Sequence, residues 1–218
     1  MTPTGWGSVG TYVFGGMGGS LPQPYKDYND LVAGAGIGFG NFYKVASVAA
    51  IWNINNVSKF NNFSGSVIAS RHLWKGSSIS AGALHLFVEK SKSDPGPSYY
   101  IVFSHAVQKS PSRNFMVSWL NYSIGVGNGR FYNKSPKDRA EGKGSFGTAL
   151  FGNISYEAFK NCNINVEWTG LNLAVGTAWR PSYRWPAIAI GVADITSLSG
   201  SPRFIFSFGH AFMLTNNR

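Results

Sequence analysis

Hydrophobic and polar residues alternate along most of the chain with a period of two. This is the spacing of a β-strand, whose successive side chains point to opposite faces. In the segment CNINVEW, Cys162, Ile164, Val166 and Trp168 alternate with polar residues. The segments LNLAVGTAWR and AIAIGVAD repeat the alternation shortly afterwards. Segments of about ten residues separated by turn residues are typical of a β-sandwich or a β-barrel.

The alternation predicts roughly 12 strands, with roughly 10 as the other count, and almost no helix. We expect strands around residues 5–14, 32–43, 45–54, 63–74, 79–89, 98–108, 115–126, 146–157, 162–168, 171–180, 187–194 and 203–214. The longest connections are then 15–30 and 127–145. Because no linker or shift of composition divides the chain, residues 1–218 are predicted to form a single domain.

The two faces of the predicted strands differ in an unusual way. One face carries large apolar residues and the other carries Gly, Ala, Ser and Asn, as in LVAGAGIGFG, where Gly34, Gly36, Gly38 and Gly40 alternate with apolar residues. A membrane barrel turns its apolar face to lipid and its small or polar face to the lumen. In lipid every backbone group must be paired, so such a sheet closes on itself. The pattern therefore predicts an all-β fold, a closed antiparallel transmembrane β-barrel, with a soluble β-sandwich as the alternative.

Composition supports the barrel. Charged residues make up 13% of the chain, about half of the roughly 25% that is usual in soluble domains. There is no apolar run long enough for a transmembrane helix. The segment MTPTGWGS lacks the features of a signal peptide, and we expect a mature, exported chain. Aromatic residues that fall near predicted strand ends are typical of interfacial girdles; they are Trp74, Trp168, Trp179, Trp185, Tyr25, Tyr28, Tyr43 and Tyr183.

The net charge of +10 comes from cations that are spread over turn-like segments. Because they form no single stripe, nucleic acid is not an expected partner. The lone cysteine, Cys162, excludes an intramolecular disulfide and a cysteine-based zinc site. The four histidines are isolated, and the G-x-S-x-G motif of serine hydrolases is absent. We therefore expect neither an enzyme nor a metal or cofactor.

The segment FIFSFGHAFML near the end of the chain carries a second signal. Its residues Ser207, Gly209, Phe212 and Leu214 resemble the C-terminal assembly signal of bacterial outer-membrane barrels, although residues 215–218 follow here where that family usually ends on the aromatic residue. The resemblance implies an outer-membrane location, with the barrel-assembly machinery as a partner.

A looser resemblance covers the last third of the chain. The segment VEWTGLNLAVGTAWRPSYRWPAIAIGVADIT is similar to strand–turn–strand units of YjbH-type outer-membrane barrels, through Glu167-Trp168, Gly176, Arg180-Pro181 and Ala193-Asp194. That family is associated with exopolysaccharide production in bacterial envelopes. The resemblance implies no catalytic residue.

These features favour a narrow, weakly anion-preferring pore for small polar solutes. A barrel of about 12 strands lies between those filled by side chains and the wide porins. The residues expected to line the lumen are Asn53, Asn163, Asn165, Glu167, Asn172, Arg180, Arg203 and Ser207. The basic segment 127–145 is the candidate for the mouth or an inserted plug, or else a surface loop; its cations are Arg130, Lys134, Lys137, Arg139 and Lys143.

The alternative function is that of a non-conducting envelope barrel. Its basic loops would bind the phosphate or acidic groups of lipopolysaccharide, a polysaccharide or a partner protein. In either case outer-membrane lipid is an expected partner, and a homo-oligomer remains open.

Overall fold

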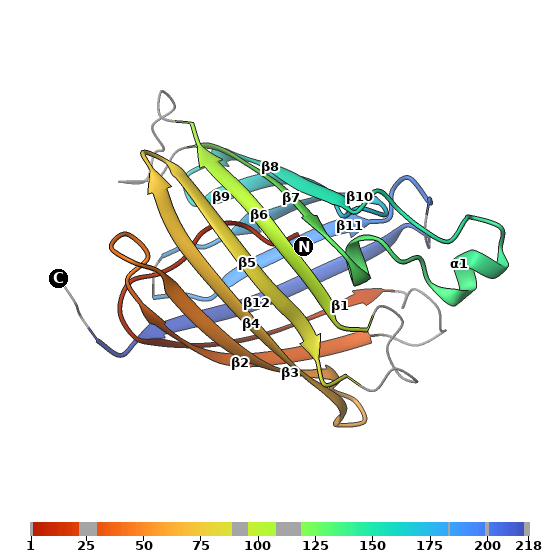
Figure 1. The fold of residues 1–218 in the computed structure, drawn as a ribbon, viewed down its shortest axis with the longest axis horizontal. Coiled ribbons are helices and arrows are strands. Elements are labelled where there is room, and N and C mark those ends of the chain that lie inside the picture. The colour runs from red at the N-terminus through yellow and green to blue at the C-terminus, as the bar shows by residue number, and fades with distance from the viewer. Residues whose placement is uncertain are drawn as a thin grey trace.

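The computed structural model describes residues 2–21, 30–88, 96–107, 119–182, 184–198 and 201–215. In this part of the chain twelve strands form one closed barrel, drawn in Figure 1. Each strand pairs antiparallel with its neighbours in sequence, and β12 closes the barrel against β1. The predicted closed all-β barrel of about 12 strands is thus confirmed.

The strands are β1 (Tyr12–Leu21), β2 (Asp30–Gly40), β3 (Ser47–Asn56), β4 (Asn61–Trp74), β5 (Ser77–Leu86), β6 (Ser98–Ala106), β7 (Leu120–Gly127), β8 (Leu150–Phe159), β9 (Cys162–Trp168), β10 (Leu173–Trp179), β11 (Ala187–Ala193) and β12 (Arg203–Met213). Two short helices, η1 (Gly129–Phe131) and α1 (Pro136–Ala140), lie between β7 and β8. None of the described helices is both long and apolar enough to cross a membrane.

The barrel has two distinct ends. At the terminus end, β1 begins, β12 ends, and the connections β2–β3, β4–β5, β8–β9 and β10–β11 turn back. At the opposite end, called the α1 end here, helix α1 stands away from the strands (Figure 1).

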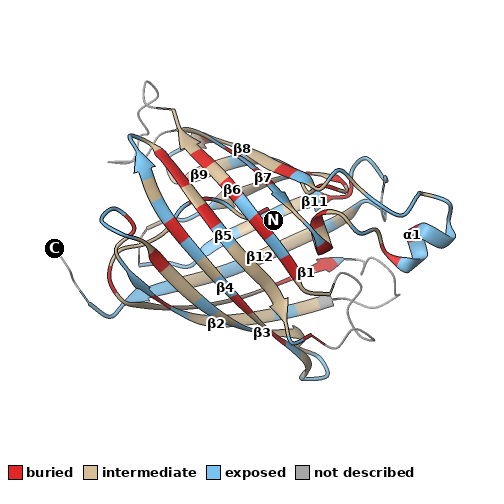
Figure 2. Ribbon diagram, viewed as in Figure 1, coloured by how far each residue is buried: buried red, intermediate tan, exposed pale blue. Residues whose placement is uncertain are grey.

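Alternation along each strand sorts the side chains as predicted. The outer surface carries exposed large apolar residues, for example Ile37, Ile124, Ile154 and Ile190. The inner face of β3–β7 is dominated by buried small polar residues. Figure 2 shows the alternation as bands of buried and exposed residues along β4, β5 and β6.

The bare inner face of β2 is covered by aromatic rings from β1. Tyr12 pairs with Gly38 and Phe14 pairs with Gly36 in the β1–β2 register. A Cβ atom added at Gly38 would collide with the Tyr12 ring, and one added at Gly36 would collide with Phe14. The alternating glycines therefore leave room for aromatic side chains that fill the concave side of the sheet.

A small aromatic core fills another part of the lumen. The rings of Phe131 and Phe151 stack with centroids 4.3 Å apart, and Tyr100 and Val102 complete the buried cluster. Phe131 belongs to η1, so the start of the β7–β8 connection folds inward. The rest of that connection lies outside the strands.

The predicted placement of aromatic residues near strand ends is confirmed where it can be followed. Trp74, Trp168 and Trp179 are the last residues of β4, β9 and β10. Tyr43 and Trp185 lie in turns at the terminus end. Tyr25, Tyr28 and Tyr183 lie outside the described residues.

The first predicted strand was wrong. A strand was expected over residues 5–14, but β1 begins at Tyr12 and continues to Leu21. Most of the residues before Tyr12 enter the lumen instead. The glycines of GGMGGS suggested a loop, yet they belong to β1, because its small side chains fit against the inner residues of β12 and β2.

Candidate functional site

Residues 2–10 cross the inside of the barrel. Gly10 starts at the terminus end, where its N–H donates to the Gly40 carbonyl at 2.8 Å. The chain then runs past β3 and β6 toward β8 and β9. In Figure 1 the N-terminal label lies within the outline of the barrel. We call residues 2–10 the lumen segment.

The lumen segment is held by side chains of the inner wall. The Ser8 N–H donates to Ser47 Oγ at 3.3 Å, and the Gly5 N–H donates to Ser104 Oγ at 2.7 Å. The Thr2 N–H donates to Glu167 Oε2 at 2.7 Å. Backbone groups that enter a barrel need such partners, because the strands have already used their own backbone groups in the sheet.

Two glycines let the segment pass close to the wall. At Gly5 an added Cβ would lie 2.8 Å from Ser78 Oγ and 2.9 Å from the Ser78 carbonyl oxygen. At Gly7 it would lie 2.6 Å from the buried ring of Phe42 and 2.9 Å from Ser70 Cβ. Only glycine therefore fits at these two positions without displacing the wall.

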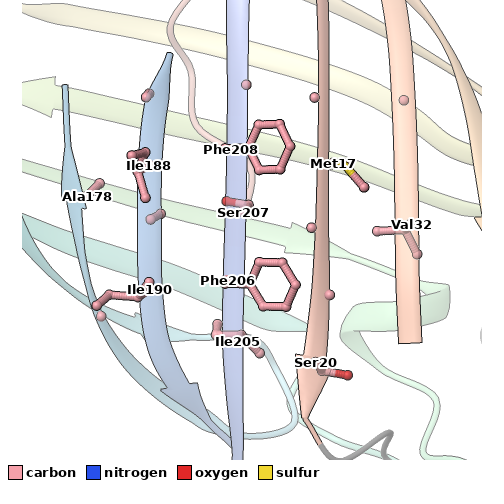
Figure 3. Close-up of a pocket in the computed structure, with 18 of the residues that line it drawn as sticks. Met17, Ser20, Val32, Ala178, Ile188, Ile190, Ile205, Phe206, Ser207 and Phe208 are labelled. Atoms are coloured by element: carbon pink, nitrogen blue, oxygen red, sulfur yellow. The ribbon is translucent and has the colours of Figure 1, made fainter. Parts of the chain in front are cut away.

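The inner wall also borders a cavity of about 670 Å³, which Glu167, the acceptor of the Thr2 N–H, helps to line. One wall consists of small residues from β1, β10 and β11, including Gly16, Gly18, Gly176, Ala178, Ala187 and Ala189. Such a volume falls within the range of small-molecule sites, roughly 300–1,000 Å³. Figure 3 shows this side of the barrel, with Ser207 and Ile205 on β12.

The polar groups around the cavity come from β3, β5 and β9. They are Asn53, Asn55, His85, Asn165 and Glu167. Ser64 connects two of them: its Oγ accepts from Asn55 Nδ2 at 3.0 Å and lies 3.3 Å from His85 Nδ1. The cavity therefore combines a small apolar wall with amide, imidazole and carboxylate groups.

Oppositely charged groups meet near the α1 end. Burial lowers the pKa of the Arg130 guanidinium, and the nearby Glu167 opposes this effect. Arg203 Nη1 lies 2.8 Å from Asp194 Oδ2. Burial raises the pKa of the Asp194 carboxyl, while Arg203 acts in the opposite direction. Near the α1 end each of these guanidinium groups is thus opposed by a carboxylate, while the buried Glu157 adds a further acid toward the terminus end.

Most of the residues predicted to line the lumen do face inward. Asn53, Asn165, Glu167 and Ser207 border the cavity. Asn163 pairs with Ala178, on the same inner face. The buried Asn172 and the partly buried Arg203 lie at the α1 end of the wall, where Asn172 Oδ1 accepts from Thr196 Oγ1 at 3.0 Å.

Arg180 is placed differently from the prediction. Its position in the alternation put it on the inner face, but β10 ends at Trp179, and Arg180 lies exposed in the following turn. There its Nε donates to the Trp185 carbonyl at 3.3 Å. The alternation of faces no longer holds beyond the end of the strand, where the backbone conformation of the turn sets the direction of the side chain.

The basic segment divides into two parts. Arg130, next to the inserted Phe131, comes within electrostatic reach of Glu167 in the lumen. The remaining cations lie outside, around α1: Lys143 pairs with Glu141 at 2.9 Å, Lys134 donates to the Leu198 carbonyl at 2.9 Å, and Arg139 is exposed. Residues 2–10 and the inserted Arg130 and Phe131 therefore share the lumen, while α1 lies outside the strands at the α1 end.

The four residues of the predicted assembly signal do not share one face. Ser207 and Gly209 pair with Gly18 and Gly16 of the inner face. The Phe212 side chain points outward and is 60% exposed, and Leu214 lies just beyond β12.

Sequence reasoning missed the lumen segment, His85 and Asn55. The signal that could have found the segment is the pair of glycines in TPTGWGSVG, since it interrupts a convincing strand pattern. His85 was treated as an isolated histidine. In the structure it contacts Ser64, next to a register shift between β4 and β5 that the alternation does not reveal.

The structure separates the adjacent serine and histidine of β6, and it shows no metal cluster among the described residues. Ser104 and His105 are adjacent in sequence but lie on opposite faces of β6, where Ser104 contacts Ser123 and His105 contacts Ser77. No group of three His, Cys, Asp or Glu side chains in the described ranges could hold a metal ion.

The chain matches no known protein-family model, and no curated protein shows significant similarity to it.

Proposed function

We propose that the protein is an outer-membrane β-barrel that gives small polar solutes a narrow passage, which the lumen segment closes in the conformation described here. The observation that carries this proposal is the cavity of about 670 Å³ inside a closed barrel, bordered by amides together with His85 and Glu167, in a lumen that the hydrogen-bonded residues 2–10 cross.

Three features support a membrane location. The outer surface of the barrel is apolar, tryptophans lie at both of its ends, and the sheet has no open edge. A lipid environment favours all three, because lipid cannot satisfy unpaired backbone groups and aromatic residues prefer the interface. The resemblance of the β12 sequence to an assembly signal favours the outer membrane.

The strength of the closure suits a reversible plug. Three backbone N–H groups of the lumen segment bind side chains of the wall. In addition, Asn153 Nδ2 donates to Thr2 Oγ1 at 2.9 Å, and the Phe42 N–H donates to the Ser8 carbonyl at 3.2 Å. Each such bond contributes on the order of 0.5–1.5 kcal/mol, and somewhat more where the acceptor is charged. A total of about 5 kcal/mol corresponds to roughly one open barrel in several thousand. The passage is then mostly closed and opens when the segment is displaced.

The weak anion preference is assigned to the mouth. Inside the barrel, Arg130 and Arg203 are opposed by Glu167 and Asp194. Around α1, by contrast, the cations Lys134, Lys137, Arg139 and Lys143 outnumber the acids Asp138 and Glu141. Because a ring of charge at a pore entrance biases the ions that enter, this excess favours anions.

The test is single-channel conductance of the detergent-purified protein in a planar bilayer, with the reversal potential in a salt gradient. Rare, discrete openings with a modest anion preference are expected. A protein that is verified as inserted and remains silent, also after the lumen segment is deleted, would contradict the pore.

A second candidate is a non-conducting barrel that binds anionic envelope molecules. It is favoured by the position of α1, which lies away from the strands (Figure 1) with Lys137 and Arg139 exposed. Replacement of both by Gln should then abolish binding of lipopolysaccharide, whereas the pore requires no such binding.

A further inference from the structure

The outer wall of the barrel carries an apolar groove of about 700 Å³ next to the β10–β11 turn. Trp179 and Trp185 border it at the terminus end, and Ile188, Ile190, Phe206 and Phe208 continue it along the strands. Ile188 pairs with Phe208 and Ile190 pairs with Phe206 in the β11–β12 register. Figure 3 shows the two phenylalanines along β12 with the isoleucines on the neighbouring β11.

The groove is long enough for most of one acyl chain. It extends along β12 from Phe208 to Phe204, which pair with Ile188 and Val192 near the two ends of β11. At the rise of a β-strand this is about 13 Å, or about 10 Å along the membrane normal for strands tilted by about 35–45°. The hydrocarbon of one leaflet is about 15 Å deep, half of the roughly 30 Å of a bilayer core. A single acyl chain that enters at the terminus end can therefore lie in the groove over most of its length.

Two arginines lie at the end of the groove next to the β10–β11 turn. Arg180 and Arg184 are exposed in the β10–β11 turn. Arg180 Nε donates to the carbonyl of Trp185 at 3.3 Å, so its guanidinium lies beside a residue that borders the groove. His210 Nδ1 lies 3.1 Å from the same carbonyl. Arginine suits this position, because its planar fork binds phosphate through two parallel hydrogen bonds.

The exposed charge of the turns at the terminus end is complementary to an anionic headgroup. The described turns at this end carry the exposed cations Lys44, Lys75, Lys160, Arg180 and Arg184, and none of their described residues is acidic. Glu157, near the same end of β8, is buried inside the barrel, where it accepts the N–H of Asn161; Asp138, Glu141 and Asp194 lie in connections at the α1 end. Cations near a membrane surface attract anionic lipid electrostatically.

We propose that the groove beside the β10–β11 turn is a binding site for an anionic phospholipid of the leaflet at the terminus end, with an acyl chain along β11 and β12 and the phosphate at Arg180 and Arg184. The inference rests on the membrane location proposed above and not on conduction, so it can hold for a barrel that is silent in a bilayer.

The experiment measures lipid retained by the full chain. The protein is purified in detergent and exchanged into nanodiscs of palmitoyl-oleoyl phosphatidylcholine with a small fraction of the corresponding phosphatidylglycerol. The lipid molecules that stay bound after the protein is released from the nanodisc are counted by native mass spectrometry. The wild type is expected to retain phosphatidylglycerol at least tenfold above its share in the disc.

The matched variants are Arg180→Gln with Arg184→Gln, and Lys44→Gln with Lys75→Gln. Both remove two cations from the same end of the barrel, but only the first pair stands at the groove. The first is expected to lose the enrichment and the second to keep most of it. An equal loss in both would overturn the site, because general attraction to the surface would then explain retention.

Ile190→Trp tests the acyl chain separately, since it fills the groove and leaves both arginines. It should lower retention of phosphatidylglycerol, whereas inorganic phosphate should not compete. Competition by phosphate alone would show an anion site without a lipid. A stable dimer that Ile190→Trp dissociates would show that a second copy covers the groove and would also overturn the proposal. Heat-modifiable mobility in gels confirms that each variant folds.

If the protein proves not to insert into bilayers at all, the proposed function fails. If it inserts, but both lipids are retained in proportion to their share, only the lipid site fails.

Discussion

The backbone N–H of Gly5 donates a 2.7 Å hydrogen bond to Ser104 Oγ, although 99 residues separate the two in sequence. Ser104 is fully buried on the inner face of β6, and its hydroxyl also lies 2.7 Å from Ser123 Oγ on β7. The bond joins a segment that precedes the first strand to the wall on the far side of the barrel. Substitutions that weaken such contacts should therefore displace the lumen segment from the wall.

Gly7→Ala should open the passage. The new methyl group would meet the buried ring of Phe42 and Ser70 Cβ, which cannot move away like the end of a flexible side chain. The segment should therefore leave the wall in a larger fraction of molecules. We expect the open probability in single-channel records to rise at least tenfold, since a strain of about 1.4 kcal/mol gives that factor.

Gly15→Ala is the control for this substitution. Gly15 lies on β1, and its added Cβ would come no closer than 3.6 Å to another atom. It should leave the open probability unchanged. An equal rise in both variants would mean that loss of glycine in general, and not displacement of the lumen segment, changes conduction.

Glu167→Gln should shift ion selectivity toward anions. Glu167 accepts the N–H of Thr2 and lies near Arg130. The amide can still accept a hydrogen bond but no longer balances the guanidinium. We expect the reversal potential in a salt gradient to move toward the chloride potential. Glu141→Gln, in the exposed loop at the mouth, should produce a smaller shift, because cations already outnumber acids there. An equal or larger shift from Glu141→Gln would show that the charge of Glu167 inside the barrel does not affect selectivity.

The strand pattern was predictable where one face is large and apolar. CNINVEW was expected as a strand, and β9 has those bounds. The alternation could also assign Asn53, Asn163 and Glu167 to the inner face, because a period of two determines the face of every residue once the strand is known.

The lumen segment could not be predicted from the alternation. TGWGSVGTYVF alternates as well as a true strand, and only the packing of Gly5 and Gly7 against the wall distinguishes it. The prediction for Arg180 was wrong for a related reason, since periodicity carries no information on where a strand stops. Pairings between distant residues, such as Gly5 with Ser104, depend on closure of the barrel, which no local pattern encodes.

The Asp194 carboxyl should make stability depend on pH in an unusual direction. Burial raises its pKa above the ordinary value, so the folded protein holds a proton that the unfolded chain has already released. The contribution to stability is therefore full below the unfolded pKa and is lost as the pH rises through the folded one. Relative to Asp194→Asn, the wild type should therefore lose Tm as the pH rises above the ordinary pKa of an aspartate, 3.8.

Thermal unfolding in detergent, followed by circular dichroism, measures this difference. Glu141→Gln changes an exposed carboxylate and should run parallel to the wild type over the same range. A wild type that gains stability relative to Asp194→Asn as the pH rises would show that the ion pair with Arg203, at 2.8 Å, outweighs the cost of burial.

Phe212→Ala should impair assembly without impairing the folded barrel. The Phe212 side chain is 60% exposed on the outer face of β12, so its removal costs little packing. Val13 of β1 is its partner at the closure of the barrel, where the backbone pairing is retained. If Phe212 is part of an assembly signal, Phe212→Ala removes a contact with the cellular assembly machinery. Refolding in detergent does not need that contact.

Two measurements on the same variants separate these effects. In a bacterial host, the folded, heat-modifiable form in the outer-membrane fraction should drop several-fold for Phe212→Ala, while Tm after refolding in detergent should stay within a few degrees of the wild type. Phe159→Ala removes a similarly exposed ring, 68% accessible, from the end of β8, and should reduce neither quantity. Equal yields of the two variants in the membrane would show that Phe212 is not read during assembly, whereas a matching loss of Tm would show that it stabilises the fold.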